Sequence, residues 1–255
     1  MIFDLQKASM WKRASAFLLD AILLTVLATG FFYLISVCTG YDAHRTIVAE
    51  AFDRIGEAYG ITPELQAKAP EDMTEAELAA IQAANAAIAA DTQAVHAYKM
   101  VVNLSVLIIT FGLLGSFLVL ELLVPLLLKN GQTLGKKIFG IAVMHGEGVR
   151  LGHVALFIRT VLGKFAVECM PLAMSALFLL SGGDIGSPVF LLIAAVLLIV
   201  QLVMVIASHE NALLHDKMAW TVTVDLSSQM IFDTHEQLLE YKKKVHAEKV
   251  ASSVY

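Results

Sequence analysis

Four long apolar segments, separated by polar stretches, dominate the hydropathy pattern of the chain. The first, Ala14 to Cys38, contains one charged residue, Asp20, and the later ones are Val101 to Leu128, Phe165 to Ser181 and Val189 to Ala207. A helix of about 20 apolar residues crosses the roughly 30 Å hydrocarbon core of a bilayer. The pattern therefore predicts four membrane-spanning helices, of which Phe165 to Ser181 is the shortest.

The polar segment between the first two predicted spans has the periodicity of helices. Gly60 is a natural end for a first helix, residues 62–64 start a short helical turn, and Thr74 with Glu77 has the spacing of a capping box for a second long helix. Two interpretations of this hairpin remain open: its apolar stripes pack on one another, or they form a docking surface for an external partner or a second copy. The apolar positions at helical spacing include Ile47, Ala51, Phe52, Ile55, Leu78, Ile81 and Ile88.

Short strands are predicted on the other side of the second span. The segment Ile138 to Leu151 reads as a strand, a turn at Gly146 to Gly148 and a second strand. Thr221 to Val224, after the fourth span, alternates in the same way and would add a third strand. A small β-element is therefore expected in an otherwise helical protein.

The predicted fold class is all-α: a polytopic transmembrane helix bundle of about four spans, with a helical extracytoplasmic insertion and a small cytoplasmic β-element. The predicted segments are the cytoplasmic N-terminus with the first span (1–38), the extracytoplasmic insertion (39–100), the second span (101–128), a cytoplasmic loop with an interfacial segment (129–164), the third and fourth spans (165–207) and a cytoplasmic C-terminal segment (208–255).

The distribution of charge sets the expected orientation in the membrane. Residues 42–99 hold four of the 18 Lys and Arg residues and ten of the 23 acids, so their formal charge is −6. Because cytoplasmic loops carry an excess of Lys and Arg, we expect this segment outside and both termini in the cytoplasm. With 58% apolar residues and a mean hydropathy of +0.72, the chain is expected in a bacterial plasma (inner) membrane, in contact with lipids and without a nucleic-acid partner.

The sequence carries no recognisable catalytic, metal-binding or cofactor-binding motif, and we expect a non-enzymatic protein without a cofactor or metal. The segment from Gly131 to Lys137 is superficially similar to a P-loop. It has three residues between its glycines instead of four, and a lysine instead of a hydroxyl residue after Lys136. His209-Glu210 is followed by His215 six residues after His209 rather than four, which does not assemble a zinc-protease site.

Ionisable residues within the apolar segments are the candidate functional residues. Asp20 follows Arg13 by seven residues, so the two lie on one helical face, about 10 Å apart along the axis. A charge at mid-bilayer costs about 2.5 to 3.5 kcal/mol on insertion scales, so Asp20 should face protein or water and have a partner. Glu121 is expected at a similar depth in the second span, and Glu168 three residues into the third.

Three patches, taken in order, resemble the RDD family of bacterial membrane proteins. They are Trp11-Lys12-Arg13 through Leu18-Leu19-Asp20, then Gly131 to Ile141 with Arg159 after it, and finally Leu214-His215-Asp216 with Thr221. The resemblance implies an α-helical membrane protein, associated with transport but without a settled activity, in which Asp216 is the second conserved-type aspartate of the family motif. The insertion 39–100 and the fourth span depart from the shorter family pattern.

Two functions fit these residues. In a transporter, Asp20 and Glu121 would bind a proton or a small cation such as sodium, with Arg13 tuning their charge. In a membrane scaffold or accessory subunit, the charges would form a fixed network while the insertion recruits a membrane protein partner. The lack of charged residues in the outer half of the first two spans favours the scaffold for a monomer, whereas a homo-oligomer would supply the missing half. The predicted polar network comprises Arg13, Asp20, Glu121, Arg159, Glu168, His215 and Asp216, and the loop motif comprises Gly131, Gln132, Thr133, Gly135 and Lys136.

Overall fold

The computed structural model describes residues 5–128, 130–183, 185–208 and 211–252, which form two compact units. One unit combines residues up to Gly30 with those from Gly112 onward, and the other comprises Phe31–Phe111. Each is described by itself below.

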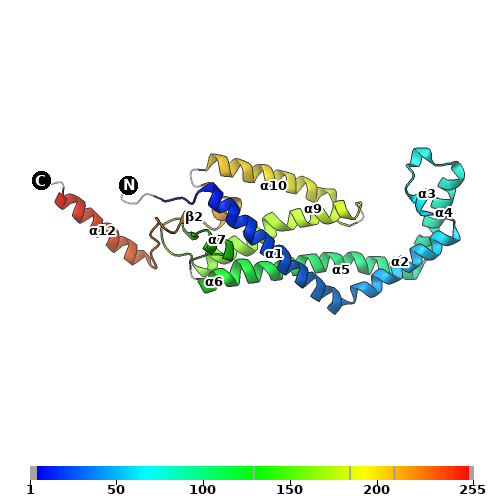
Figure 1. The fold of residues 1–255 in the computed structure, drawn as a ribbon, viewed down its shortest axis with the longest axis horizontal. Coiled ribbons are helices and arrows are strands. Elements are labelled where there is room, and N and C mark those ends of the chain that lie inside the picture. Colours follow the sequence, from blue (N-terminus) through cyan, green and yellow to red (C-terminus); the bar gives the residue numbers. More distant parts are fainter. Residues whose placement is uncertain (1–4, 129, 184, 209–210, 253–255) are drawn as a thin grey trace. The chain divides into compact units, whose positions relative to one another are not determined.

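Four helices among the described residues are long and apolar enough to cross a membrane: Met10–Thr39, Thr92–Leu128, His153–Leu180 and Pro188–Ala207 (Figure 1). The first is α1 and the last is α10. The second consists of α5 (Thr92–Phe117), a π-helical segment η2 (Leu118–Leu123) and α6 (Val124–Leu128), and the third of α8 (His153–Phe157), a π-helical segment η3 (Ile158–Cys169) and α9 (Met170–Leu180). The prediction of an all-α polytopic membrane protein with four spans is confirmed.

The third span begins earlier than the hydropathy pattern predicts. Its helix starts at His153, not at Phe165, so Glu168 lies well inside the helix rather than three residues from its end. Arg159 and Lys164 lower the local hydropathy, but both are buried against other side chains of the protein and so do not end the helix. The outward faces of the spans remain strongly apolar, as a lipid-facing surface requires; Phe17, Val26, Leu198 and Ile206 are all more than half exposed.

A two-stranded antiparallel sheet lies in the same unit. Strand β1 (Ile141–His145) pairs with β2 (Thr221–Asp225), with Val143 opposite Thr223. Each strand directly follows a five-residue helix, α7 (Leu134–Ile138) before β1 and α11 (Leu214–Met218) before β2. The strand expected after the turn at Gly146 to Gly148 is reduced to isolated bridges at residues 149 and 150. The sheet core is formed by Ala142, Met144, Val222 and Val224.

The C-terminal segment ends in a helix, α12 (His235–Ser252), that packs onto the chain near the sheet. Leu238 on this helix is buried, and the ring of Tyr241 lies 5.2 Å from that of Phe232. The tail after Ser227 is thus attached to the protein by its apolar side chains, at least through its first turns.

The second unit contains the helical insertion. Helix α2 (Tyr41–Ala58) is followed by the short α3 (Pro63–Gln66), the 3-10 turn η1 (Pro70–Asp72) and α4 (Glu75–Ala90). Gly60 follows the end of α2 in a left-handed conformation (φ 68°), and the expected capping box of Thr74 and Glu77 is present. Thus the helical prediction for the insertion is confirmed.

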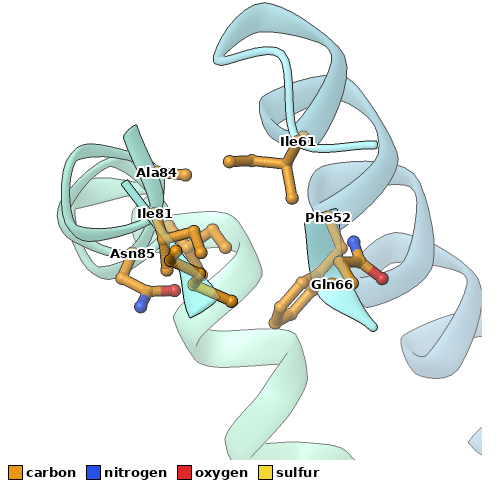
Figure 2. Close-up of a pocket in the computed structure, with 9 residues that line it drawn as sticks. Phe52, Ile61, Gln66, Ile81, Ala84 and Asn85 are labelled. Atoms are coloured by element: carbon orange, nitrogen blue, oxygen red, sulfur yellow. The ribbon is translucent and has the colours of Figure 1, made fainter. Parts of the chain in front are cut away.

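A pocket of about 270 Å³ opens between α2 and α4 within this unit. Figure 2 shows Phe52 and Ile61 facing Ile81 and Ala84 across it, so the stripes of the two helices do approach one another, although they leave a gap between them. The amides of Gln66 and Asn85 are at its edge.

Candidate functional site

Asp20 of the first span holds the beginning of α7. The hydroxyl of Thr133 donates a hydrogen bond to one carboxylate oxygen, and the backbone N–H of Gly135 donates to the other at 2.8 Å. Thr133 is itself the N-cap of α7, where its hydroxyl accepts from the N–H of Lys136. The ammonium of Lys136 lies 4.0 Å from Asp20. Asp20 therefore has protein partners, as a carboxylate in a span requires.

Gly135 permits this close approach of α7 to the first span. A Cβ atom at this position would collide with the carbonyl oxygen of Ala16 and would lie 2.9 Å from the carboxyl carbon of Asp20. The other residues of the loop motif also have structural roles. Gly131 adopts φ 59° beside the carbonyl of Val143, and the amide of Gln132 donates to the carbonyl of Ile141 at 2.8 Å.

Asp216 is the most completely buried carboxylate of the unit. Arg159 donates to one of its oxygens from Nε at 3.0 Å and from Nη2 at 2.8 Å, and Arg13 Nη2 lies 3.5 Å from the other. The hydroxyl of Thr221 donates to it as well. Burial disfavours the carboxylate, but the positive charge of Arg159 outweighs this effect and holds the pKa of Asp216 below its usual value.

His215, the neighbour of Asp216, connects α11 to the third span. Its backbone N–H donates to Glu168 at 3.0 Å, and its Nδ1 lies 2.9 Å from both oxygens of the same carboxylate. Its Nε2 lies 3.2 Å from Arg159, a group that can only donate, so Nδ1 carries the proton of the neutral ring. Burial lowers the pKa of His215, which is consistent with a neutral imidazole.

Glu121 lies in the π-helical segment of the second span and pairs with the third. Lys164 Nζ is 2.5 Å from its carboxylate, and the hydroxyl of Thr160 donates to its backbone carbonyl at 3.0 Å. A π-helical turn alters the regular pattern of backbone hydrogen bonds and is frequent at functional sites. Here that turn presents both a side chain and a carbonyl group to the neighbouring span.

Lys136 is the buried base whose charge is held least firmly. Burial lowers its pKa to about 7, and the nearby positive charge of Lys164 adds to this effect, while Glu121 and Asp20 oppose it. Its partners are more distant than those of Arg159: the ammonium donates to Thr133 at 3.2 Å and lies 4.0 Å from Asp20.

The structure brings all seven residues of the predicted network into one unit, but with different partners from those expected. The recorded ion pair of Arg13 is with Asp216, so the expectation that Arg13 tunes Asp20 and Glu121 needs correction. His215 and Asp216, although adjacent, do converge, because both contact the guanidinium of Arg159. Sequence reasoning missed Lys164 and Thr160; the signal was a lysine and a hydroxyl in a helix that begins twelve residues before the predicted third span.

Neither a metal site nor a disulfide is found in the described part of the chain. No group of three or more His, Cys, Asp or Glu side chains there is placed to hold a metal ion, and Cys38 and Cys169 are free. The sequence pair His209-Glu210 lies outside the described residues.

These features define a multi-pass integral membrane protein with a buried ion-pair cluster at the helix ends that adjoin a small sheet. The family model of the RDD family matches residues 7–220. The chain therefore belongs to the RDD family. No curated protein and no solved structure matches it significantly.

The depressed pKa of Lys136 predicts a specific dependence of stability on pH. In the unfolded chain a lysine titrates near 10.4, so between pH 7 and about 10 the unfolded state binds more protons and folding becomes more favourable as pH rises. We expect the melting temperature of the wild type to rise relative to that of Lys136→Met over this range, by the equivalent of about 1 kcal/mol per pH unit. Melting curves of both proteins in detergent from pH 7 to 9.5 provide the check. A constant difference between them would mean that Lys136 stays charged throughout.

Proposed function

We propose that the protein transports protons, or exchanges a small cation such as sodium for protons, and that the exchange occurs at Asp20, Lys136 and Glu121. The observation that carries this proposal is the buried, loosely paired Lys136, which interacts electrostatically with both carboxylates. The setting is a plasma membrane, in the orientation given by the positive-inside rule, with both termini in the cytoplasm and no enzymatic activity.

The chemistry follows from competition for one pair of carboxylates. With Lys136 protonated, its charge offsets that of Asp20 and Glu121, and an additional cation is not attracted. When Lys136 loses its proton, the site gains one negative charge, which favours entry of a cation. Because the pKa of Lys136 is about 7, this change takes place at physiological pH. One proton is thereby exchanged for one monovalent cation.

A flux assay tests this proposal. Purified protein in liposomes that contain a pH-sensitive dye is exposed to gradients of sodium, lithium or potassium. We expect proton movement with the wild type, and at least a tenfold lower rate with Asp20→Asn at equal folded yield. The matched control is Asp225→Asn, which removes a carboxylate that pairs with Lys12 outside the buried cluster and should leave the flux unchanged. Equal flux in wild type and Asp20→Asn would contradict the proposal.

A scaffold or accessory role is the second candidate. It is favoured by the firm pairing elsewhere in the cluster, above all Arg159 with Asp216, and by the separate compact unit that the insertion forms. The same liposomes distinguish the two functions. Absence of flux for every cation, together with a stable membrane protein partner or second copy captured through residues 43–99, would favour the scaffold.

A further inference from the structure

The segments that contain α7 with β1 and α11 with β2 are built alike, at a constant offset of 80 residues. The helices Leu134–Ile138 and Leu214–Met218 and the strands Ile141–His145 and Thr221–Asp225 all correspond at this offset. The unusual backbone conformations correspond too. Positive φ angles occur at Gly131 and Asn211 (59° and 50°) before each helix, and at Gly140 and Trp220 (64° and 49°) between each helix and its strand.

The hydrogen bonds around the sheet follow the same correspondence. The N–H of Leu226 donates to the carbonyl of Gly140 at 3.0 Å, and the N–H of Gly146 donates to that of Trp220 at 2.9 Å. Adding 80 to one pair of residues and subtracting it from the other interchanges these two bonds. Val143 and Thr223, which are also 80 residues apart, face one another at the centre of the ladder. This pattern is that of a local two-fold axis between the strands.

The correspondence extends to the acids of the spans. The N–H of Gly135 donates to Asp20 at 2.8 Å, and the N–H of His215, 80 residues later, donates to Glu168 at 3.0 Å. Each of these helices also touches the span that supplies its acid. A Cβ at Gly135 would collide with Ala16, four residues before Asp20, and a Cβ at Gly163, five residues before Glu168, would lie 2.6 Å from that of His215. The one extra residue falls in the π-helical segment η3, which has more residues per turn than an α-helix.

We propose that the chain is an internal duplication of one unit, made of two spans, a short helix and a strand, and that Glu168 is the counterpart of Asp20. In each copy, the acid of the first span is a positioning residue that fixes the beginning of the short helix and hence the strand that follows. The insertion lies between the spans of the first copy, whereas residues 181–187 connect those of the second.

The duplication places the ion-pair cluster at the boundary between the copies. Glu121 of the first copy pairs with Lys164 of the second, and Arg13 of the first pairs with Asp216 of the second. Because each copy has two spans, both have the same orientation in the membrane, and their axis runs along the membrane normal. Transporters built from such parallel repeats bind their substrates at the repeat interface. The duplication does not depend on transport, however, and holds equally for a scaffold.

Hydrogen exchange of the full-length protein in detergent tests the counterpart role of Glu168. Peptides that cover residues 134–138 and 214–218 report on the two short helices separately. We expect Asp20→Asn to accelerate exchange at least tenfold in 134–138 only, and Glu168→Gln to do so in 214–218 only. The matched control is Ser175→Ala, a buried hydroxyl of the third span that bonds to its own helix, which should change neither peptide.

Two outcomes would overturn the proposal: wild-type exchange of 214–218 in Glu168→Gln, or equal acceleration of both peptides in either variant. Should the neutral variants not fold, Asp20→Glu and Glu168→Asp keep the charge but shift the carboxylate. The same separation between the two peptides is then expected, and its absence would count against the duplication in the same way.

Discussion

Asp216→Asn is expected to be the most destabilising single substitution in this protein, with a loss of about 3 to 5 kcal/mol in the free energy of unfolding. The substitution keeps the shape of the side chain but removes the negative charge that Arg159 and Arg13 share. Arg159 is only 3% exposed, so its guanidinium would remain buried without a full counter-charge. Breaking a buried pair from one side is costly for this reason, even where replacing the whole pair is not.

The folded yield and melting temperature of Asp216→Asn in detergent measure this effect. The control is Asp225→Asn, in which the lost partner is the largely exposed Lys12 and the expected loss is below about 1 kcal/mol. Comparable melting temperatures for the two variants would show that the contacts of Asp216 contribute little. The depressed pKa of Asp216 gives a second sign: its stabilising contribution is complete above the usual titration range of an aspartate and is lost only in strong acid.

Gly135→Ala should have the second-largest effect, although it adds a single methyl group. The added Cβ would overlap the backbone of Ala16 and press against the carboxylate of Asp20, so α7 must move away from the first span. That movement lengthens the hydrogen bonds from Gly135 and Thr133 to Asp20. Overpacking and weakened bonds to a charged group together predict a loss of about 2 to 4 kcal/mol.

Gly30→Ala is the matched control for this substitution. Gly30 lies in the same first span, and a Cβ there meets nothing within 4 Å. Because alanine favours a helix by about 1 kcal/mol over glycine, Gly30→Ala should be neutral or slightly stabilising. Melting temperatures of the two variants decide the matter. If Gly135→Ala melts with the wild type, α7 does not lie as close to the first span as described.

The four spans could be predicted from the sequence because their signal is compositional. A run such as Val189 to Ala207 has one dominant explanation, whatever it packs against. The helical insertion was predictable for a similar reason, since Thr74 with Glu77 is a local capping signal. The start of the third span was not, because Arg159 and Lys164 resemble a polar loop until their buried partners, Asp216 and Glu121, are known.

Membership of the polar network was predictable, but its pairing was not. Helical spacing placed Arg13 and Asp20 on one face of the first span, yet their partners come from residues more than 100 positions later, Asp216 for Arg13 and Gly135 for Asp20. The repeated helix and strand were also beyond sequence reasoning. Between residues 131–145 and 211–225, only Leu134 matches Leu214 and Lys137 matches Lys217. Backbone conformation and hydrogen bonding reveal the correspondence instead.

Transport at the pair of Asp20 and Lys136 is tested most directly by measuring sodium-driven proton flux in liposomes with the double variant Asp20→Asn, Lys136→Met. Replacing both members of a buried ion pair is often neutral for stability, so the variant is expected to fold. We expect wild-type liposomes to exchange protons for sodium and the folded double variant to give only the flux of empty liposomes. Wild-type flux in the double variant would contradict the account.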